Sequence, residues 1–128
     1  GKLLRQGSDV SIISTGIMVS EALLAADILN EEGYAATVLH FPTVKPMDVE
    51  TVLKAARSTG GIVTCEEHSI IGGLGEAVSA IVSEFYPCPV IRVGVMDRFG
   101  ESGTASELLD KYGLRAGNIV AAAKKIIK

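Results

Sequence analysis

The sequence has few of the residues that mark several common classes of protein. It contains no tryptophan, and aromatic residues make up only 5% of its 128 positions, which argues against the base-stacking platforms of single-strand nucleic-acid binders. Its net charge of −3 lacks the basic excess of a protein that binds nucleic acid or an anionic membrane. No apolar run approaches the roughly 20 residues of a membrane span. We therefore expect neither nucleic acid nor a membrane as a partner.

Cysteine and histidine are also scarce. Cys65 and Cys88 form no C-x-x-C pair, and the two histidines do not supply the spacing of a zinc site. Cys65 lies in an apolar run and is expected in the core. This use of cysteine favours a reducing, cytoplasmic compartment. Because the chain begins at Gly1 rather than at methionine, we expect a processed, truncated or excised chain, or a first residue left over from cloning.

What the sequence has is an alternation of strand and helix patterns. Hydrophobic residues make up 48% of the chain, and its length suits one domain, residues 1–128. The expected strands are residues 10–14, 36–41, 62–65 and 90–93, with a short edge strand at residues 3–5. Apolar strands that alternate with amphipathic helices predict an α/β fold with a mainly parallel sheet, covered by helices on both faces.

The expected helices have recognisable ends and apolar stripes. Gly33 follows the first helix, where a positive φ is easy for glycine, and Asp48 is expected to cap the second. The last helix has only Gly117 or Asn118 to open it. The predicted buried stripes are Val19, Ala22, Leu23, Ala26 and Leu29; Val49, Val52, Leu53 and Ala56; Leu74, Ala77, Val78, Ile81, Val82 and Phe85; and Ile119, Val120, Ala123 and Ile127. A capping box predicts a further short helix from Thr104 to Tyr112.

The most informative segment follows the strand that we expect to end at Cys65. Polar residues come directly after it, and glycines then lead into the next helix. In a parallel sheet, the crevice beyond the carboxyl ends of the strands is where ligands and partner domains dock. The residues concerned are Glu66, Glu67, His68, Gly72, Gly73 and Gly75.

Several roles for this segment are open from the residues alone. Glu67 could orient His68 in an acid–base site, the glycines could cradle a small anion at a helix N-terminus, or the segment could contact another domain. A dinucleotide fingerprint is disfavoured because Val78 stands where its third glycine is needed. A second loop after a strand carries Arg98, which could bind an anion, and Phe99, which could fill a pocket; a loop that docks on a partner is the simpler interpretation.

Three segments, in order, resemble the C-terminal domain of the transketolase family. They are residues 41–48 (FPTVKPMD), 66–75 (EEHSIIGGLG) and 97–103 (DRFGESG). The likeness extends from about Gly7 to Lys128 and is strongest to the second subunit of two-part transketolases. Deoxyxylulose-phosphate synthase and the β subunit of the decarboxylating component of 2-oxoacid dehydrogenases are related alternatives.

The resemblance implies a three-layer α/β/α domain with five strands, mostly parallel, the first antiparallel at an edge. It implies an enzyme that transfers two-carbon ketol units between sugar phosphates with thiamine diphosphate and a divalent metal such as Mg²⁺. Those groups bind to pyrimidine-binding and pyrophosphate-binding domains, which match nothing in this sequence, so the resemblance implies no catalytic, cofactor or metal residue here.

This chain would instead support domain packing and subunit association, in a homodimer or heterotetramer. The expected contact residues are Glu66, Glu67, His68, Gly72, Gly73, Gly75, Arg98 and Phe99. Two other roles are alternatives: a regulatory module that binds a small anion or effector in the strand-end crevice, and a free-standing catalyst that uses His68 and Glu67.

Overall fold

The structure is a computed structural model that describes residues 1–42, 47–69, 73–95 and 115–127. Its centre is a five-stranded sheet in the order β1-β3-β2-β4-β5. The edge strand β1 pairs antiparallel with β3, and the other neighbours are parallel. The strands are β1 (Lys2–Arg5), β2 (Val10–Ser14), β3 (Ala36–His40), β4 (Ile62–Ser69) and β5 (Val90–Val95).

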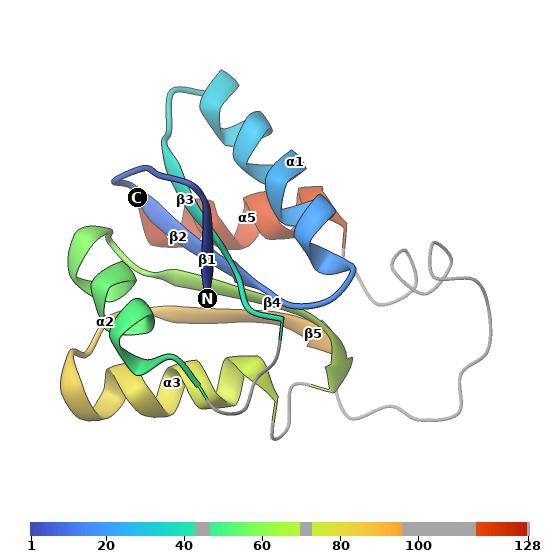
Figure 1. Ribbon diagram of the computed structural model, residues 1–128. Helices are drawn as coiled ribbons and strands as arrows, with labels where there is room; N and C mark the ends of the chain where they lie inside the picture. Colours follow the sequence, from blue (N-terminus) through green and yellow to red (C-terminus); the bar gives the residue numbers. More distant parts are fainter. Residues whose placement is uncertain (43–46, 70–72, 96–114, 128) are drawn as a thin grey trace.

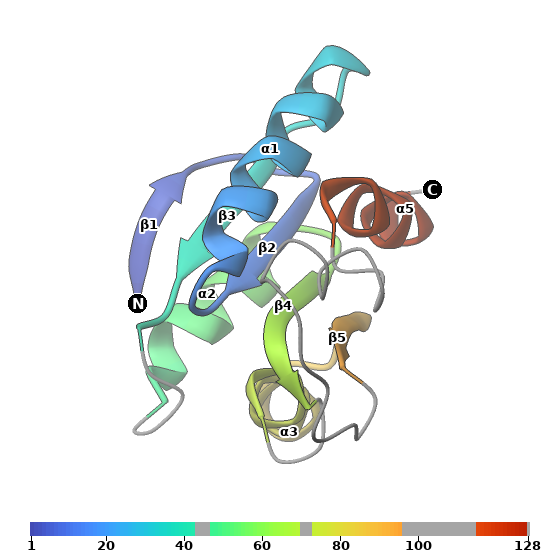
Figure 2. The same cartoon turned by 90° about the vertical axis from the view of Figure 1, so that its right-hand side faces the viewer.

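Helices cover both faces of this sheet, which makes three layers (Figures 1 and 2). On one face lie α1 (Met18–Glu31) and α5 (Ala116–Ile127); on the other lie α2 (Val49–Ser58) and α3 (Leu74–Phe85). The expected α/β/α architecture, with an antiparallel first strand at the edge, is confirmed. None of the helices in the described ranges is both long and apolar enough to cross a bilayer.

Each face of the sheet has its own apolar core, because successive side chains of a strand point to opposite faces. Ile12 of β2 packs with α1 and α5, whereas its neighbour Ile13 packs with α2 and α3. Both side chains are fully buried. The continuous apolar runs that predicted a two-sided sheet therefore serve two separate cores.

Two expected helix ends are confirmed. Gly33 has φ +91° after the C-terminus of α1, a conformation that glycine adopts without a steric penalty. Asp48 caps α2, and its Oδ1 accepts a hydrogen bond from the Thr51 N–H at 3.2 Å. The start of α5 partly agrees with expectation, because the Asn118 Oδ1 accepts a hydrogen bond from the Arg115 N–H at 3.2 Å. Glu21 of α1 supplies a second acceptor that was not expected: its Oε1 lies 2.8 Å from the Ala116 nitrogen. Glu21 and Ala116 are 95 residues apart in the sequence, so no local sequence pattern predicts the hydrogen bond between them.

The end of one strand and the buried stripes of the helices need correction. The fourth strand does not end at Cys65: β4 continues to Ser69, because it pairs again with β5 at Val95 after a register shift. Phe85 is 59% exposed, since the buried face of α3 is the narrower stripe through Leu74, Val78 and Val82. Val49 is exposed in the first turn of α2. Five further residues of the predicted stripes are only partly buried: Ala77 and Ile81 on α3, Val19 and Leu23 on α1, and Ile127 on α5. The expected helix at residues 104–112 lies outside the described residues.

Candidate interdomain site at the carboxyl edge of the sheet

The carboxyl ends of β2 and β3 are joined to each other and to the middle of β4, which continues beyond them to Ser69. The Phe41 N–H donates to the Ser14 carbonyl at 2.9 Å, which joins the end of β3 to β2. The Thr15 N–H donates to the Cys65 carbonyl at 3.1 Å, which joins β2 to β4. Both bonds continue the parallel ladder beyond the ends of β2 and β3. Residues that follow these strands are thus supported on a common platform.

Glu66 lies at this edge, but its side chain points inward. The residue is only 2% exposed. Its Oε1 accepts a hydrogen bond from the Leu74 N–H and its Oε2 one from the Gly75 N–H, each at 2.8 Å. Two free N–H groups and the positive end of the helix dipole meet a carboxylate there, an arrangement that stabilises a helix N-terminus. Glu66 therefore fastens the start of α3 to β4.

This role of Glu66 was missed by the sequence analysis, which grouped it with residues that face a partner. A capping box would place the acid three residues inside the helix. Here the acid precedes its two donors by eight and nine residues. A glutamate just after an apolar strand and shortly before a glycine-started helix was the available signal, and it did not specify the direction of the side chain.

Gly75 is needed for packing within the chain. A Cβ atom at this position would lie 2.6 Å from Cγ and Cδ of Arg92 and 2.9 Å from Oγ1 of Thr64. These distances are too short for any other residue without movement of β4 or β5 side chains. Gly73, the N-cap residue of α3, has φ −102°, which other residues also adopt. Replacing Gly73 therefore needs no strained backbone.

The remaining expected contact residues are only partly placed. Glu67 and His68 belong to β4, but their side chains lie outside the description. Gly72, Arg98 and Phe99 also lie outside the described residues. Among the residues expected at this site, the structure thus brings together Glu66, Gly73 and Gly75, at the junction of β4 and α3.

The described part of the edge has little capacity for chemistry. The Cys65 thiol is fully buried, and burial, with a smaller effect of the Glu66 carboxylate, raises its pKa; this keeps it unreactive and confirms Cys65 as a core residue. The Glu66 carboxylate occupies the N-terminus of α3, where an anion would otherwise be held. Within the described ranges, no three His, Cys, Asp or Glu side chains gather as metal ligands would.

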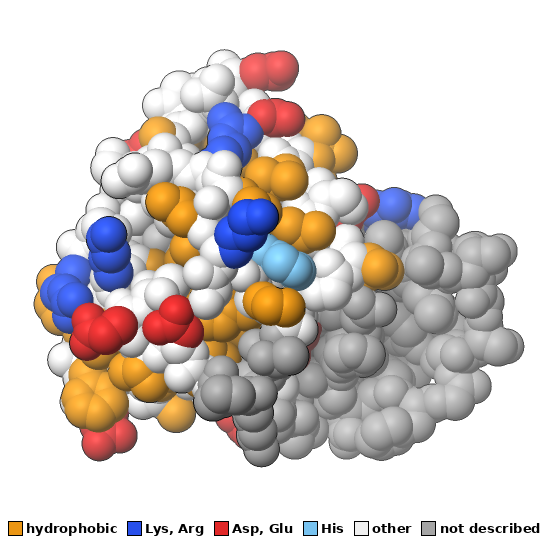
Figure 3. All heavy atoms as spheres, in the orientation of Figure 1, with side chains coloured by type: hydrophobic (Ala, Val, Ile, Leu, Met, Phe, Trp, Pro, Cys, Tyr) orange, Lys and Arg blue, Asp and Glu red, His pale blue; other side chains and the backbone are white. Residues whose placement is uncertain are grey.

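A second surface was not anticipated. Exposed hydrophobic side chains lie on β1 and around α1: Leu4, Ile17 and Leu24 are 36%, 43% and 50% exposed. Figure 3 shows hydrophobic and basic side chains mingled over these elements. His40 ends β3 beside Lys2 of β1 in the sheet register, and its Nδ1 is buried without a hydrogen-bond partner among the described residues. Large exposed apolar side chains are typical of contact surfaces when they gather.

Comparison with known proteins decides the family. The sequence model of the family described as "Transketolase, C-terminal domain" matches residues 1–119. The chain belongs to the transketolase C-terminal domain family. A solved structure described as "Split gene transketolase, inactive beta4 tetramer" superposes with a TM-score of 0.92 and 52% identity, over 98% of this chain and 41% of that one. The resemblance inferred from the three sequence segments is thereby confirmed.

Curated relatives of this transketolase C-terminal domain include different enzymes. The 6-deoxy-6-sulfo-D-fructose transketolase subunit of Clostridium sp. (strain MSTE9) is 52% identical over 97% of the chain and 38% of its own length. The 1-deoxy-D-xylulose-5-phosphate synthase of Heliobacterium modesticaldum is 45% identical over 98% of the chain and 20% of its own length. The chain thus spans between a fifth and two fifths of these relatives.

Proposed function

We propose that residues 1–128 form the C-terminal domain of a transketolase-type enzyme that transfers two-carbon ketol units between sugar phosphates. The observation that carries this proposal is the family match over residues 1–119, together with 52% identity to a transketolase subunit. The domain acts through contacts with other domains, and the enzyme works in the cytoplasm. Synthesis of deoxyxylulose phosphate is the second candidate, favoured by the 45% identity to such a synthase.

Thiamine diphosphate and a divalent metal such as Mg²⁺ would bind elsewhere in the enzyme, on its pyrimidine-binding and pyrophosphate-binding domains. The described residues of this chain do not fit these groups. The Glu66 carboxylate stands at the N-terminus of α3 and would repel a diphosphate, and the described ranges contain no cluster of metal-binding side chains. We therefore assign no catalytic step to this chain.

The contact surface that we propose is the carboxyl edge of the sheet, where partner domains dock in α/β folds. Its contact residues would be Glu67, His68, Gly72, Gly73, Arg98 and Phe99. Glu66 is left out of this set because its carboxylate already binds the N-terminus of α3. It supports the surface indirectly, by holding α3 against β4. The enzyme would assemble as a homodimer or heterotetramer. The related structure is described as a tetramer, which agrees with association but concerns that protein.

The experiment compares the isolated chain with the enzyme that contains it. His68→Ala should change the free energy of unfolding of the isolated chain by no more than about 1 kcal/mol, while assembly and turnover of the complete enzyme fall. Gly73→Leu should act similarly, since its φ suits leucine. If His68→Ala collapses the isolated chain but spares turnover, the interdomain role of His68 is wrong. Calorimetric titration of the chain with thiamine diphosphate and Mg²⁺ should show no binding.

A further inference from the structure

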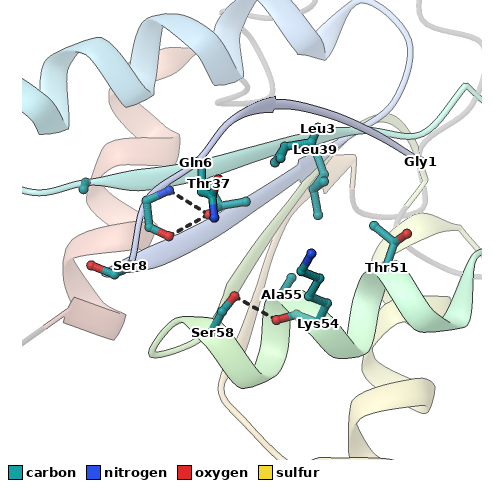
Figure 4. Close-up of a pocket in the computed structure, with 12 residues that line it drawn as sticks. Gly1, Leu3, Gln6, Ser8, Thr37, Leu39, Thr51, Lys54, Ala55 and Ser58 are labelled. Carbon is teal, nitrogen blue, oxygen red and sulfur yellow. Dashed lines mark hydrogen bonds between the residues drawn. The ribbon is translucent and has the colours of Figure 1, made fainter.

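A groove separates the edge strand β1 from α2, and its use is unassigned. It encloses about 510 Å³, a volume typical of small-molecule pockets. Leu3 and Leu39 line it from the sheet, Ala55 and Lys54 from the helix. Figure 4 shows these side chains around one open space. On the sheet, the groove is lined by residues of β1 and β3. None of the contact residues proposed above lines it.

One charged side chain lines the groove. Lys54 rises from α2 with its amino group pointing toward Leu3 and Leu39 (Figure 4), and none of the lining residues is acidic. Among the described residues, its amino group has no ion-pair partner; the nearby Glu50 carboxylate instead pairs with Arg57 at 3.8 Å. A cation over an apolar floor is complementary to an anion that carries an apolar body.

Two hydroxyl groups of the groove are already engaged within the chain. The Thr37 hydroxyl donates to the Gly7 carbonyl at 2.7 Å and accepts from the Gly7 N–H at 3.0 Å. The Ser58 hydroxyl donates to the Lys54 carbonyl at 2.8 Å. The side chains of Gln6 and Ser8 also line the groove. Because Lys54 is the one cationic side chain among the described residues of this lining, the groove suits one negative charge better than a phosphate dianion, which is best matched by several charged donors.

We propose that this groove binds a small organic monocarboxylate, with the carboxylate on the Lys54 ammonium and the apolar body on Leu3, Leu39 and Ala55. The test is a titration of the 128-residue chain with octanoate, followed by amide chemical shifts in NMR spectra. Shifts should concentrate at Thr37, Leu39 and Ala55. Octanamide, which has the same shape but no charge, should bind more weakly.

Variants separate the charge from the apolar floor. Lys54→Gln should weaken octanoate binding by roughly two- to fivefold, as expected for loss of one ion pair of an exposed lysine, and leave octanamide binding unchanged. Leu3→Asn should weaken both ligands. Lys125→Gln, an exposed lysine on α5 across the sheet, is the matched control and should change neither. Equal binding of octanoate and octanamide, unchanged affinity in Lys54→Gln, tighter binding of inorganic phosphate, or shifts outside the groove would each overturn the proposal. None of these outcomes bears on the interdomain role.

Discussion

The carboxylate of Glu66 should contribute a large share of the stability of this domain. Glu66→Gln keeps the size of the side chain but replaces one acceptor oxygen with an NH₂ group, which then faces the N–H of Leu74 or Gly75. Loss of a hydrogen bond to a charged group costs about 1.5–3 kcal/mol, and loss of the charge at the helix N-terminus adds about 0.5–1 kcal/mol. We therefore expect the free energy of unfolding to fall by roughly 2–4 kcal/mol, out of about 5–15 kcal/mol for a typical domain.

Urea denaturation followed by circular dichroism measures this loss. The midpoint should fall while the slope stays constant, which indicates a change in stability rather than in the unfolded state. Glu84→Gln is the matched control, because it removes the same charge from an exposed position near the other end of α3. It should change stability by no more than about 0.5 kcal/mol. If Glu66→Gln is as mild as the control, the Glu66 carboxylate does not hold α3 as described.

Three further predictions concern the helices. Glu21→Gln should lower the unfolding free energy by about 1–2 kcal/mol in the same assay, because it weakens a hydrogen bond to Ala116 and an ion pair with Arg115; an unchanged midpoint would exclude this link between α1 and α5. Val78→Ala should lower the free energy of unfolding by roughly 2 kcal/mol in denaturant titrations. This loss should equal or exceed that of Ile81→Ala, although valine is smaller, because Val78 is fully buried and Ile81 only partly. A larger loss for Ile81→Ala would contradict the assigned buried face of α3. The hydrogen bond from the Thr51 hydroxyl, followed by that from the N-terminal ammonium, lowers the pKa of Asp48 to about 2, so its contribution is complete at neutral pH and disappears as pH falls from about 4 toward 2. Asp48→Asn should flatten the pH dependence of the melting temperature in that window, and an identical acid limb would show that Asp48 does not contribute.

Sequence patterns predicted the strands well because a two-sided parallel sheet needs continuous apolar runs. Val10–Ser14 was placed with its observed bounds, and Asp48 and Gly33 marked helix ends through local chemistry. The end of β4 was misplaced because Glu66 and Glu67 are polar, whereas the strand continues through pairing with β5. The predicted buried stripe of α3 included too many residues. Periodicity shows which residues share a helix face, but it does not show how much of that face the sheet covers.

The sequence by itself determined the alternation of elements, the two-sided sheet and, through three motifs in order, the family. These properties depend on residues close together in the chain or on long motifs that can be recognised without coordinates. Only the tertiary structure decided that Glu66 points toward α3 rather than toward a partner, because the direction of its side chain depends on where the helix begins after the turn. It also decided that Leu3, Leu39 and Lys54 line one groove, since their proximity results from antiparallel pairing of β1 with β3 and from packing of α2 on the same face.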